Sequence, residues 1–75
     1  MKLGGGIGMN RKFVTSHRIS SVGWENNILE VEFKDGTINK YYGVSEQEYL
    51  ALINSPSLDE EIDSMEHKHP YQRVN

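Results

Sequence analysis

Alternating hydrophobicity on both sides of one Asp-Gly pair constrains the fold of this chain more than any other feature. In "ILEVEFKDGTINKYY", residues 28–42, apolar side chains alternate with charged or polar ones. This is the period of a half-buried β-strand. Asp35-Gly36 is a favoured pair for a two-residue type I′ turn, because that turn needs positive φ at both central positions. We therefore predict a β-hairpin centred on these two residues.

The register of this hairpin decides which of two adjacent tyrosines is buried. Counting outward from a two-residue turn sets Leu29 opposite Tyr42 and Glu30 opposite Tyr41. Successive residues of a strand face opposite sides of the sheet. We therefore expect Tyr42 in the core, Tyr41 on the outer polar face, and Lys40 snorkelling from the core face.

A second turn is predicted upstream, in "HRISSVGWENNI". A two-residue loop at residues 26–27 pairs Trp24 with Leu29 on the buried face. Ile19 falls out of phase with this strand, and a β-bulge over residues 20–21 restores its phase. Three strands in antiparallel meander order follow.

Two short helices are predicted after the meander. Ser45 with Glu48 forms a capping box, and Ser57 with Glu60 forms a second one. Pro70 ends the second helix. The inward stripes are Tyr49, Leu52 and Ile53, then Leu58, Ile62 and Met65. The expected fold is α+β of order β-β-β-α-α, with "HPYQRV" as a short C-terminal strand or an extended tail.

Length and composition limit how such a fold is stabilised. The chain has 75 residues and no cysteine, which predicts one small domain with neither disulfides nor a thiolate zinc site. Oligomerisation or a ligand is the usual remaining reinforcement. No apolar run is long enough for a membrane span and no secretion signal is visible, so we expect a soluble cytoplasmic protein without membrane contact.

The first residues differ in composition from the rest. "MKLGGGIG", residues 1–8, is glycine-rich and has no periodicity. We interpret it as a disordered leader or a miscalled start, with a single domain over residues 9–75. A phosphate-binding glycine loop is the competing interpretation, but no strand precedes the glycines and no Gly-Lys-Ser/Thr follows them.

Charge is unevenly distributed along the chain. The net charge is -3, yet residues 1–24 contain bases and no acids, whereas residues 45–66 contain acids and no bases. Such a split can create a bipolar field that steers a partner. The alternative is that acidic helices simply face solvent.

Several stretches together resemble one known family. They are "SSVGW", "LEVEFKDG", "YYGVSEQEYLALINSPS" and "PYQRV", and they resemble the KTSC domain over roughly residues 14–74. This short domain stands alone in bacteria and phages and also occurs at the C-terminus of some lysyl-tRNA synthetases. The resemblance implies no assigned activity, although RNA binding has been suggested from the synthetase association. Members usually carry Tyr-x-Tyr where this chain has Asn39 and Tyr41, and a basic segment where it has "LDEEIDSMEHKH".

Candidate functional residues are aromatic and basic side chains near the predicted outer face. Such a face stacks unpaired bases in several RNA-binding modules, although Glu30 and Glu32 oppose a phosphate backbone. The same groups could hold a small nucleotide in a groove between protomers. The candidates for ligand or nucleic-acid binding are Tyr41, Arg18, Lys34, Lys40, Tyr71 and Arg73.

Catalysis and metal binding have little support in the sequence. "EHKH", with Glu66, His67 and His69, has spacing that can bind a metal, and Asp63 lies one helical turn away. No further ligand is secure, so we assign no metal, cofactor or catalytic residue. We expect a non-catalytic binding module that acts through protein binding or self-assembly. RNA binding, and sequestration of a nucleotide by an oligomer, are the alternatives.

Overall fold

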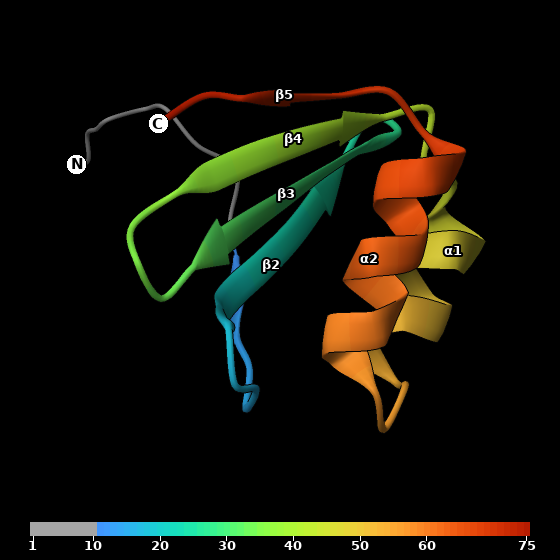
Figure 1. Cartoon of the computed structure of the whole chain (residues 1–75). Helices are drawn as coiled ribbons and strands as arrows, with labels where there is room; N and C mark the ends of the chain where they lie inside the picture. Colours follow the sequence, from blue (N-terminus) through green and yellow to red (C-terminus); the bar gives the residue numbers. More distant parts are fainter. Residues whose placement is uncertain (1–10) are drawn as a thin grey trace, which may run out of the picture.

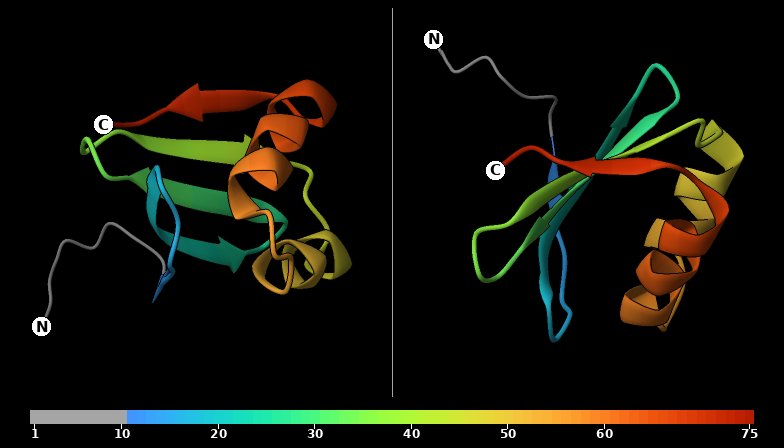
Figure 2. Two further views of the ribbon diagram at one scale, coloured as in Figure 1. Left: turned by 60° about the horizontal axis from the view of Figure 1, so that its bottom comes forward. Right: turned by 45° about the horizontal axis from the view of Figure 1, so that its top comes forward.

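One five-stranded antiparallel sheet carries two helices on one side (Figures 1 and 2). The computed structural model describes residues 11–75. Its strands lie in the order β1-β2-β3-β4-β5. The elements are β1 (Lys12–Phe13), β2 (Ile19–Glu25), β3 (Ile28–Phe33), β4 (Ile38–Tyr42), α1 (Glu46–Ile53), α2 (Leu58–Lys68) and β5 (Tyr71–Arg73).

The α+β class, the antiparallel sheet and the two helices are confirmed, and the number of strands is corrected. The predicted meander is β2-β3-β4, and β1 and β5 extend it on either side. "PYQRV" does form a short strand. No sequence pattern indicated β1, in which only two residues pair. The predicted leader at residues 1–8 and the predicted domain start at residue 9 lie outside the described residues.

The hairpin of β2 and β3 forms as predicted. Asn26 and Asn27 have φ values of 53° and 64°, as a two-residue type I′ loop requires. Trp24 pairs with Leu29, and the register shifts between Ile19 and Ser21. This bulge brings Ile19 into the core, where it is fully buried.

The hairpin of β3 and β4 was predicted in the wrong register. Its loop has three residues, 34–36, closed by hydrogen bonds from Phe33 N to Thr37 O (2.8 Å) and from Gly36 N to Phe33 O (3.0 Å). Gly36 has a positive φ of 94°, whereas Asp35 does not. This is a type I turn followed by a glycine bulge. Leu29 therefore pairs with Tyr41, and each side chain of β4 faces the side opposite to the predicted one.

The core lies between the sheet and the two helices. Leu52 of α1 and Ile62 and Met65 of α2 are buried against it, so both predicted helical stripes are confirmed. The Ser45–Glu48 capping box is present. The predicted box at Ser57 is wrong, because the Ser57 side chain makes no capping bond and its backbone N–H donates instead to Ser55 Oγ at 3.0 Å. Neither described helix is long and apolar enough to cross a membrane.

Candidate functional site at the β5 edge of the sheet

Tyr41, predicted to face outward, is fully buried between the sheet and α2. Its hydroxyl donates to Glu66 Oε2 at 3.2 Å and accepts from Asn39 Nδ2 at 3.3 Å. Burial, with a smaller contribution from Glu66, raises the pKa of Tyr41 to about 12. The corrected hairpin register explains this position, and the hydroxyl is neutral at physiological pH. Tyr41 is therefore a core residue and offers no platform for a base.

Asn39 lies on the same side of β4 as Tyr41 and is only 8% exposed. Members of the family that the sequence resembles usually carry a tyrosine here, and the predicted hairpin register placed this position on the outer face of the sheet. That interpretation is wrong, because this position faces the helices. Asn39 instead pairs with Arg73 of β5 in the sheet.

Tyr71 supplies the exposed aromatic ring that was predicted at Tyr41. It stands opposite Tyr41 in the sheet, and the two rings stack with centroids 5.2 Å apart. Tyr71 nevertheless remains 47% exposed. The buried ring of Tyr41 packs against one face of the Tyr71 ring, and this contact holds Tyr71 in place at the edge of the sheet.

The candidate basic residues do not converge on one surface. Arg18 binds α2, since its guanidinium donates to Asp63 Oδ1 at 3.0 Å and to Asp59 O at 3.1 Å. The hydrogen bond with Asp63 raises the pKa of Arg18. Lys40 lies on the helix-free face, opposite Glu30. Lys34, in the hairpin loop, is exposed. Of the six candidates, Tyr71 and Arg73 lie together on β5, and Tyr41 stacks beneath Tyr71 in the core.

The uneven charge of the sequence is partly neutralised within the domain. Arg18, from the basic half, contacts Asp59 and Asp63 of the acidic helix α2. Arg11 pairs with Glu30 at 2.6 Å. These contacts fix the start of β2 against α2 and the start of the described chain against β3, so part of the predicted bipolar field is used in folding.

Glu66, His69 and Asp63 of the predicted metal motif bind other partners. Glu66 accepts from Tyr41, and His69 Nε2 lies 2.9 Å from Glu48 Oε2 at the start of α1. Within residues 11–75, no three His, Cys, Asp or Glu side chains lie close enough together to hold a metal ion. His69 thus links the end of α2 to the beginning of α1.

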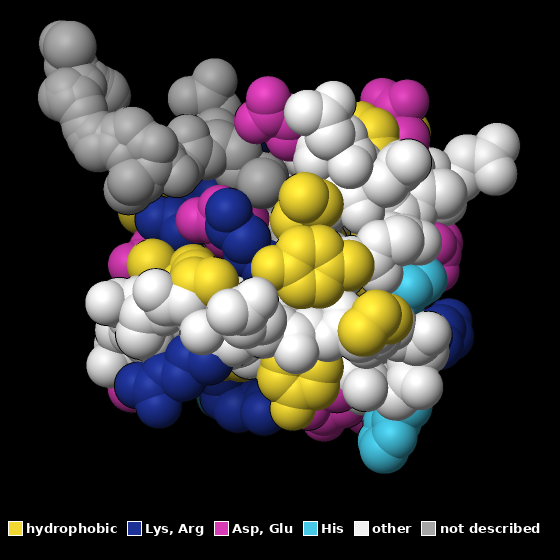
Figure 3. Space-filling model, turned by 90° about the horizontal axis from the view of Figure 1, so that it is seen from above, with side chains coloured by type: hydrophobic (Ala, Val, Ile, Leu, Met, Phe, Trp, Pro, Cys, Tyr) yellow, Lys and Arg dark blue, Asp and Glu magenta, His cyan; other side chains and the backbone are white. Residues whose placement is uncertain are grey.

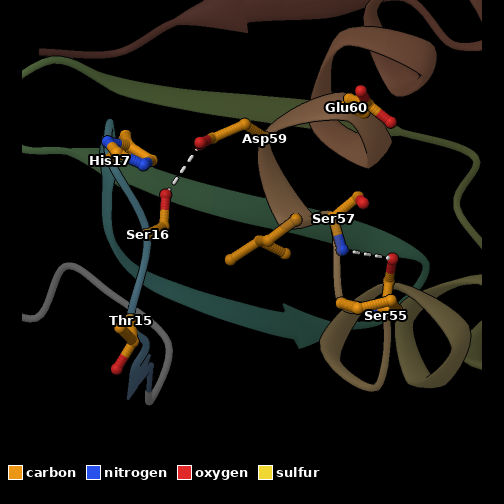
Figure 4. Close-up of a pocket in the computed structure, with 9 residues that line it drawn as sticks. Thr15, Ser16, His17, Ser55, Ser57, Asp59 and Glu60 are labelled. Carbon is orange, nitrogen blue, oxygen red and sulfur yellow. Dashed lines mark hydrogen bonds between the residues drawn. The ribbon is translucent and has the colours of Figure 1, made fainter.

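A hydroxyl-lined cavity of about 330 Å³ lies between the start of β2 and the turn joining the helices (Figure 4). Ser16 Oγ donates to Asp59 Oδ1 at 2.7 Å and accepts from the backbone N–H groups of Arg18 and Ile19. The Ser16 hydroxyl bonds directly to the Asp59 carboxylate, and His17 lies to one side of this pair. Ser16 therefore does not bond to a histidine, as the nucleophile of a catalytic triad does. The sequence had no signal for this cavity, which forms from segments far apart in the chain.

The β5 edge of the sheet exposes two apolar side chains, Tyr71 and Val74. Each of the three β5 residues is exposed, and Val74, directly after them, is 46% exposed. Figure 3 looks down on this part of the molecule and shows hydrophobic side chains gathered across the middle of the view. An edge strand with apolar flanks is a site at which another polypeptide can add.

Comparison with known proteins identifies the class of this domain. The family model of the KTSC domain matches residues 15–60. The chain therefore belongs to the KTSC domain family, and the predicted resemblance is confirmed. The crystal structure of a KTSC domain protein from Yersinia pestis is similar, with a TM-score of 0.80 and 27% sequence identity. The match covers 88% of this chain and 97% of that one. A search of curated proteins gave no match.

Proposed function

We propose that this chain is a small, non-catalytic binding module of bacterial or phage origin that assembles with a second copy of itself through β5. The observation that carries the proposal is the exposed edge of the sheet at Tyr71–Arg73. Edge strands present backbone N–H and C=O groups to which another strand can bond. A domain of this size also has little core and gains stability from association.

Backbone hydrogen bonds to β4 alternate along this segment and leave one side of β5 available. Pro70 C=O and Val74 N–H bond to β4, at 2.9 and 2.8 Å, and Gln72 stands opposite a β4 residue. Successive residues of a strand direct their backbone groups to opposite sides. Tyr71 and Arg73 therefore direct theirs away from β4, toward an incoming strand.

The geometry of this edge suits pairing between identical strands. An antiparallel pair of β5 strands about a two-fold axis at Gln72 sets Tyr71 of one protomer opposite Arg73 of the other. These are the two residues whose backbone groups face outward, so each would bond its counterpart. The ring of Tyr71 would then lie beside a guanidinium group, a favourable contact.

Light scattering after size exclusion tests the proposal. The chain has a mass of 8.6 kDa, and we expect twice this mass at about 100 µM, for a dimer with a Kd in the micromolar range. A chain that stays at the monomer mass up to about 1 mM contradicts the proposal, since any association would then be weaker than about -4.1 kcal/mol.

A matched pair of variants locates the interface. Arg73→Pro removes a backbone N–H that faces away from β4, so the ladder inside the domain is kept while the proposed intermolecular bond is lost. Arg73→Ala removes the side chain but keeps that N–H. We expect the proline variant to be a folded monomer by circular dichroism and scattering, and the alanine variant to remain a dimer. Two variants of equal mass contradict pairing through the backbone of β5.

A further inference from the structure

An exposed phenylalanine lies at one edge of the helix-free face of the sheet. Phe13 of β1 is 85% exposed, whereas the other exposed large hydrophobic side chains of the described residues are 45–47% exposed. Phe13 pairs with Ser21, and the Ser21 hydroxyl bonds to Glu32 on the face away from the helices. Residues directly opposite in a ladder share one face of the sheet. Phe13 therefore presents an apolar ring to solvent on the helix-free face.

A hollow of about 480 Å³ lies near the opposite edge of the same face, at β4 and β5. Ile38 and Val74 are neighbours there, since the Val74 N–H donates to Ile38 O at 2.8 Å. Within the described residues, Lys40 forms no ion pair. An aromatic ring suits this site, because aliphatic side chains pack against it and an ammonium group is attracted to its face. The residues that line the hollow are Glu30, Ile38, Lys40, Val74 and Asn75.

Phe13 and the hollow lie on one row of paired residues that crosses the sheet. Phe13 pairs with Ser21, and Ser21 pairs with Glu32. Glu32 in turn pairs with Ile38, beside Val74. Neighbouring strands lie about 4.8 Å apart, so about 14 Å separates the backbones of Phe13 and Ile38. The phenylalanine ring therefore cannot reach the hollow of its own chain.

A second copy of the chain brings the ring and the hollow together. A two-fold axis parallel to the strands, at Glu32 in the middle of the row, reverses the order of the strands and places β1 of each copy against β4 and β5 of the other. The axis leaves positions along the strands unchanged, so Phe13 of each copy meets the hollow of the other. The two sheets then pack face to face about 10 Å apart. The Glu32 carboxylates near the axis are each held by Ser21 at 3.0 Å and by Arg11 at 3.7 Å.

We propose that two copies of this chain associate through their helix-free faces, with Phe13 of each copy inserted between Ile38, Lys40 and Val74 of the other. The contact is isologous, because the same surface acts on both sides. It uses side chains on a face of the sheet, whereas the pairing of β5 uses backbone groups at an edge. Each copy therefore has two separate surfaces for self-association, and the partner copy fills the hollow.

NMR on a mixed sample tests this contact. Half of the chains carry ¹³C and half are unlabelled, at a total of about 1 mM, which is the Kd expected for so small an apolar contact. We expect nuclear Overhauser effects from the Phe13 ring of unlabelled chains to the Ile38 and Val74 methyl groups of labelled chains. The separation of about 14 Å excludes an origin within one chain. Pairing of β5 gives no such signal, because it leaves β1 at the far edge of each sheet.

Dilution of variants locates the contact independently of β5. The Arg73→Pro chain lacks the proposed β5 pairing, and at a Kd of about 1 mM it is still mostly monomeric at about 100 µM. Between these concentrations we expect its Ile38 and Lys40 amide signals to shift. Adding Phe13→Ser or Val74→Lys, both at exposed positions, should abolish the shifts. Leu50→Ser and Leu50→Lys make the same changes at an exposed apolar position of α1, and should keep them.

Two results overturn the proposal. The first is a mixed sample at about 1 mM without the Phe13–Ile38 and Phe13–Val74 signals. The second is a Phe13→Ser chain whose amide signals shift on dilution as much as those of the Arg73→Pro chain alone. If Arg73→Pro does not fold, the mixed sample of the parent chain gives the decision. Loss of β5 pairing with retention of the Phe13 signals contradicts the edge contact and supports the face contact.

Discussion

The two hairpins of the central meander differ by one loop residue, and that residue determines which side chains reach the core. Between β2 and β3 the loop is Asn26-Asn27, with both residues at positive φ. Between β3 and β4 it is Lys34-Asp35-Gly36, with only Gly36 at positive φ. Both solutions match the twist of the flanking strands. A loop that is one residue longer shifts the pairing of the next strand by one residue. An error of one residue in the predicted loop therefore places every side chain of that strand on the wrong face of the sheet.

The three-residue loop of the second hairpin makes one tertiary and one local hydrogen bond. The Lys34 N–H donates to Arg18 O at 2.8 Å, at the start of β2. The Asp35 carboxylate accepts from the Thr37 N–H at 2.9 Å and so closes the turn without a positive φ at Asp35. The first hairpin has no such side-chain contact in its loop. Each loop makes one backbone hydrogen bond outside its own hairpin, because Asn27 O accepts from the Val44 N–H at 2.9 Å. The two loops therefore differ in the Asp35–Thr37 bond, which belongs to the second hairpin.

Truncation of the two adjacent tyrosines gives the largest expected difference. Tyr41 is fully buried, whereas Tyr42 is half-buried and its hydroxyl donates to Gln72 Oε1 at 3.3 Å. We expect Tyr41→Ala to lower the free energy of unfolding by about 3–5 kcal/mol. Tyr42→Ala should lower it by about 1 kcal/mol. Urea denaturation of both variants measures the comparison.

A milder substitution covers the case in which Tyr41→Ala does not fold. Tyr41→Phe keeps the ring and removes the hydroxyl that bonds Glu66 and Asn39. Its expected cost is about 1 kcal/mol, because two polar groups lose a partner. Tyr42→Phe is the matched control. The register described for β4 is contradicted if Tyr42→Ala is less stable than Tyr41→Ala, or if Tyr42→Phe is less stable than Tyr41→Phe.

Substitutions at turn positions with positive φ give the next largest effect on stability. We expect the effect to have opposite signs in the two hairpins, because one substitution removes a glycine and the other introduces one. A methyl group at Gly36 would meet no atom within 4 Å, so Gly36→Ala is strained only through its φ of 94°. The expected loss is about 1–2 kcal/mol. In the first hairpin, Asn27→Gly relieves a positive φ. The greater entropy of unfolded glycine offsets part of this gain, so stability should rise by only about 0.5 kcal/mol.

Thermal melts of these two single variants, each against the parent chain, measure that pair of effects. Asn27→Ala is the matched control, because it keeps the positive φ of 64° while removing the side chain that tolerates it. We expect Asn27→Ala to be destabilised in the same direction as Gly36→Ala. A Gly36→Ala variant as stable as the parent chain contradicts the three-residue loop.

Local sequence was sufficient to predict much of this fold. Alternation located β2, β3 and β4, the Asn-Asn pair set the first register, and Ser45 with Glu48 marked the start of α1. Each of these signals lies within a few residues of the feature it specifies. They are reliable because turn and cap energies are themselves local.

The candidate site was harder to predict because it depends on contacts between distant residues. An Asp-Gly pair fits both a two-residue loop and a three-residue loop, so the pair alone did not decide the register of β4. The burial of Tyr41 needs Glu66, and the burial of Glu30 needs Arg11. With β4 inverted, the predicted outer aromatic face lost Tyr41. Binding of RNA or of a nucleotide therefore stays a prediction without its central residue.

The smallest expected effect is a pH dependence confined to the second hairpin. Hydrogen bonding from Thr37 lowers the pKa of Asp35 below 3.8. A carboxyl group whose pKa is depressed by folding stabilises the fold above its unfolded pKa and loses that contribution as pH falls through the folded value. The Thr37 amide signal should therefore move below pH 3.8, and the Asp35→Asn variant should lose this transition. The loop at Asn26-Asn27 has no carboxylate, so its amides serve as the internal reference. A Thr37 transition that persists in Asp35→Asn contradicts the turn contact and, with it, the proposed reason for the difference between the hairpins.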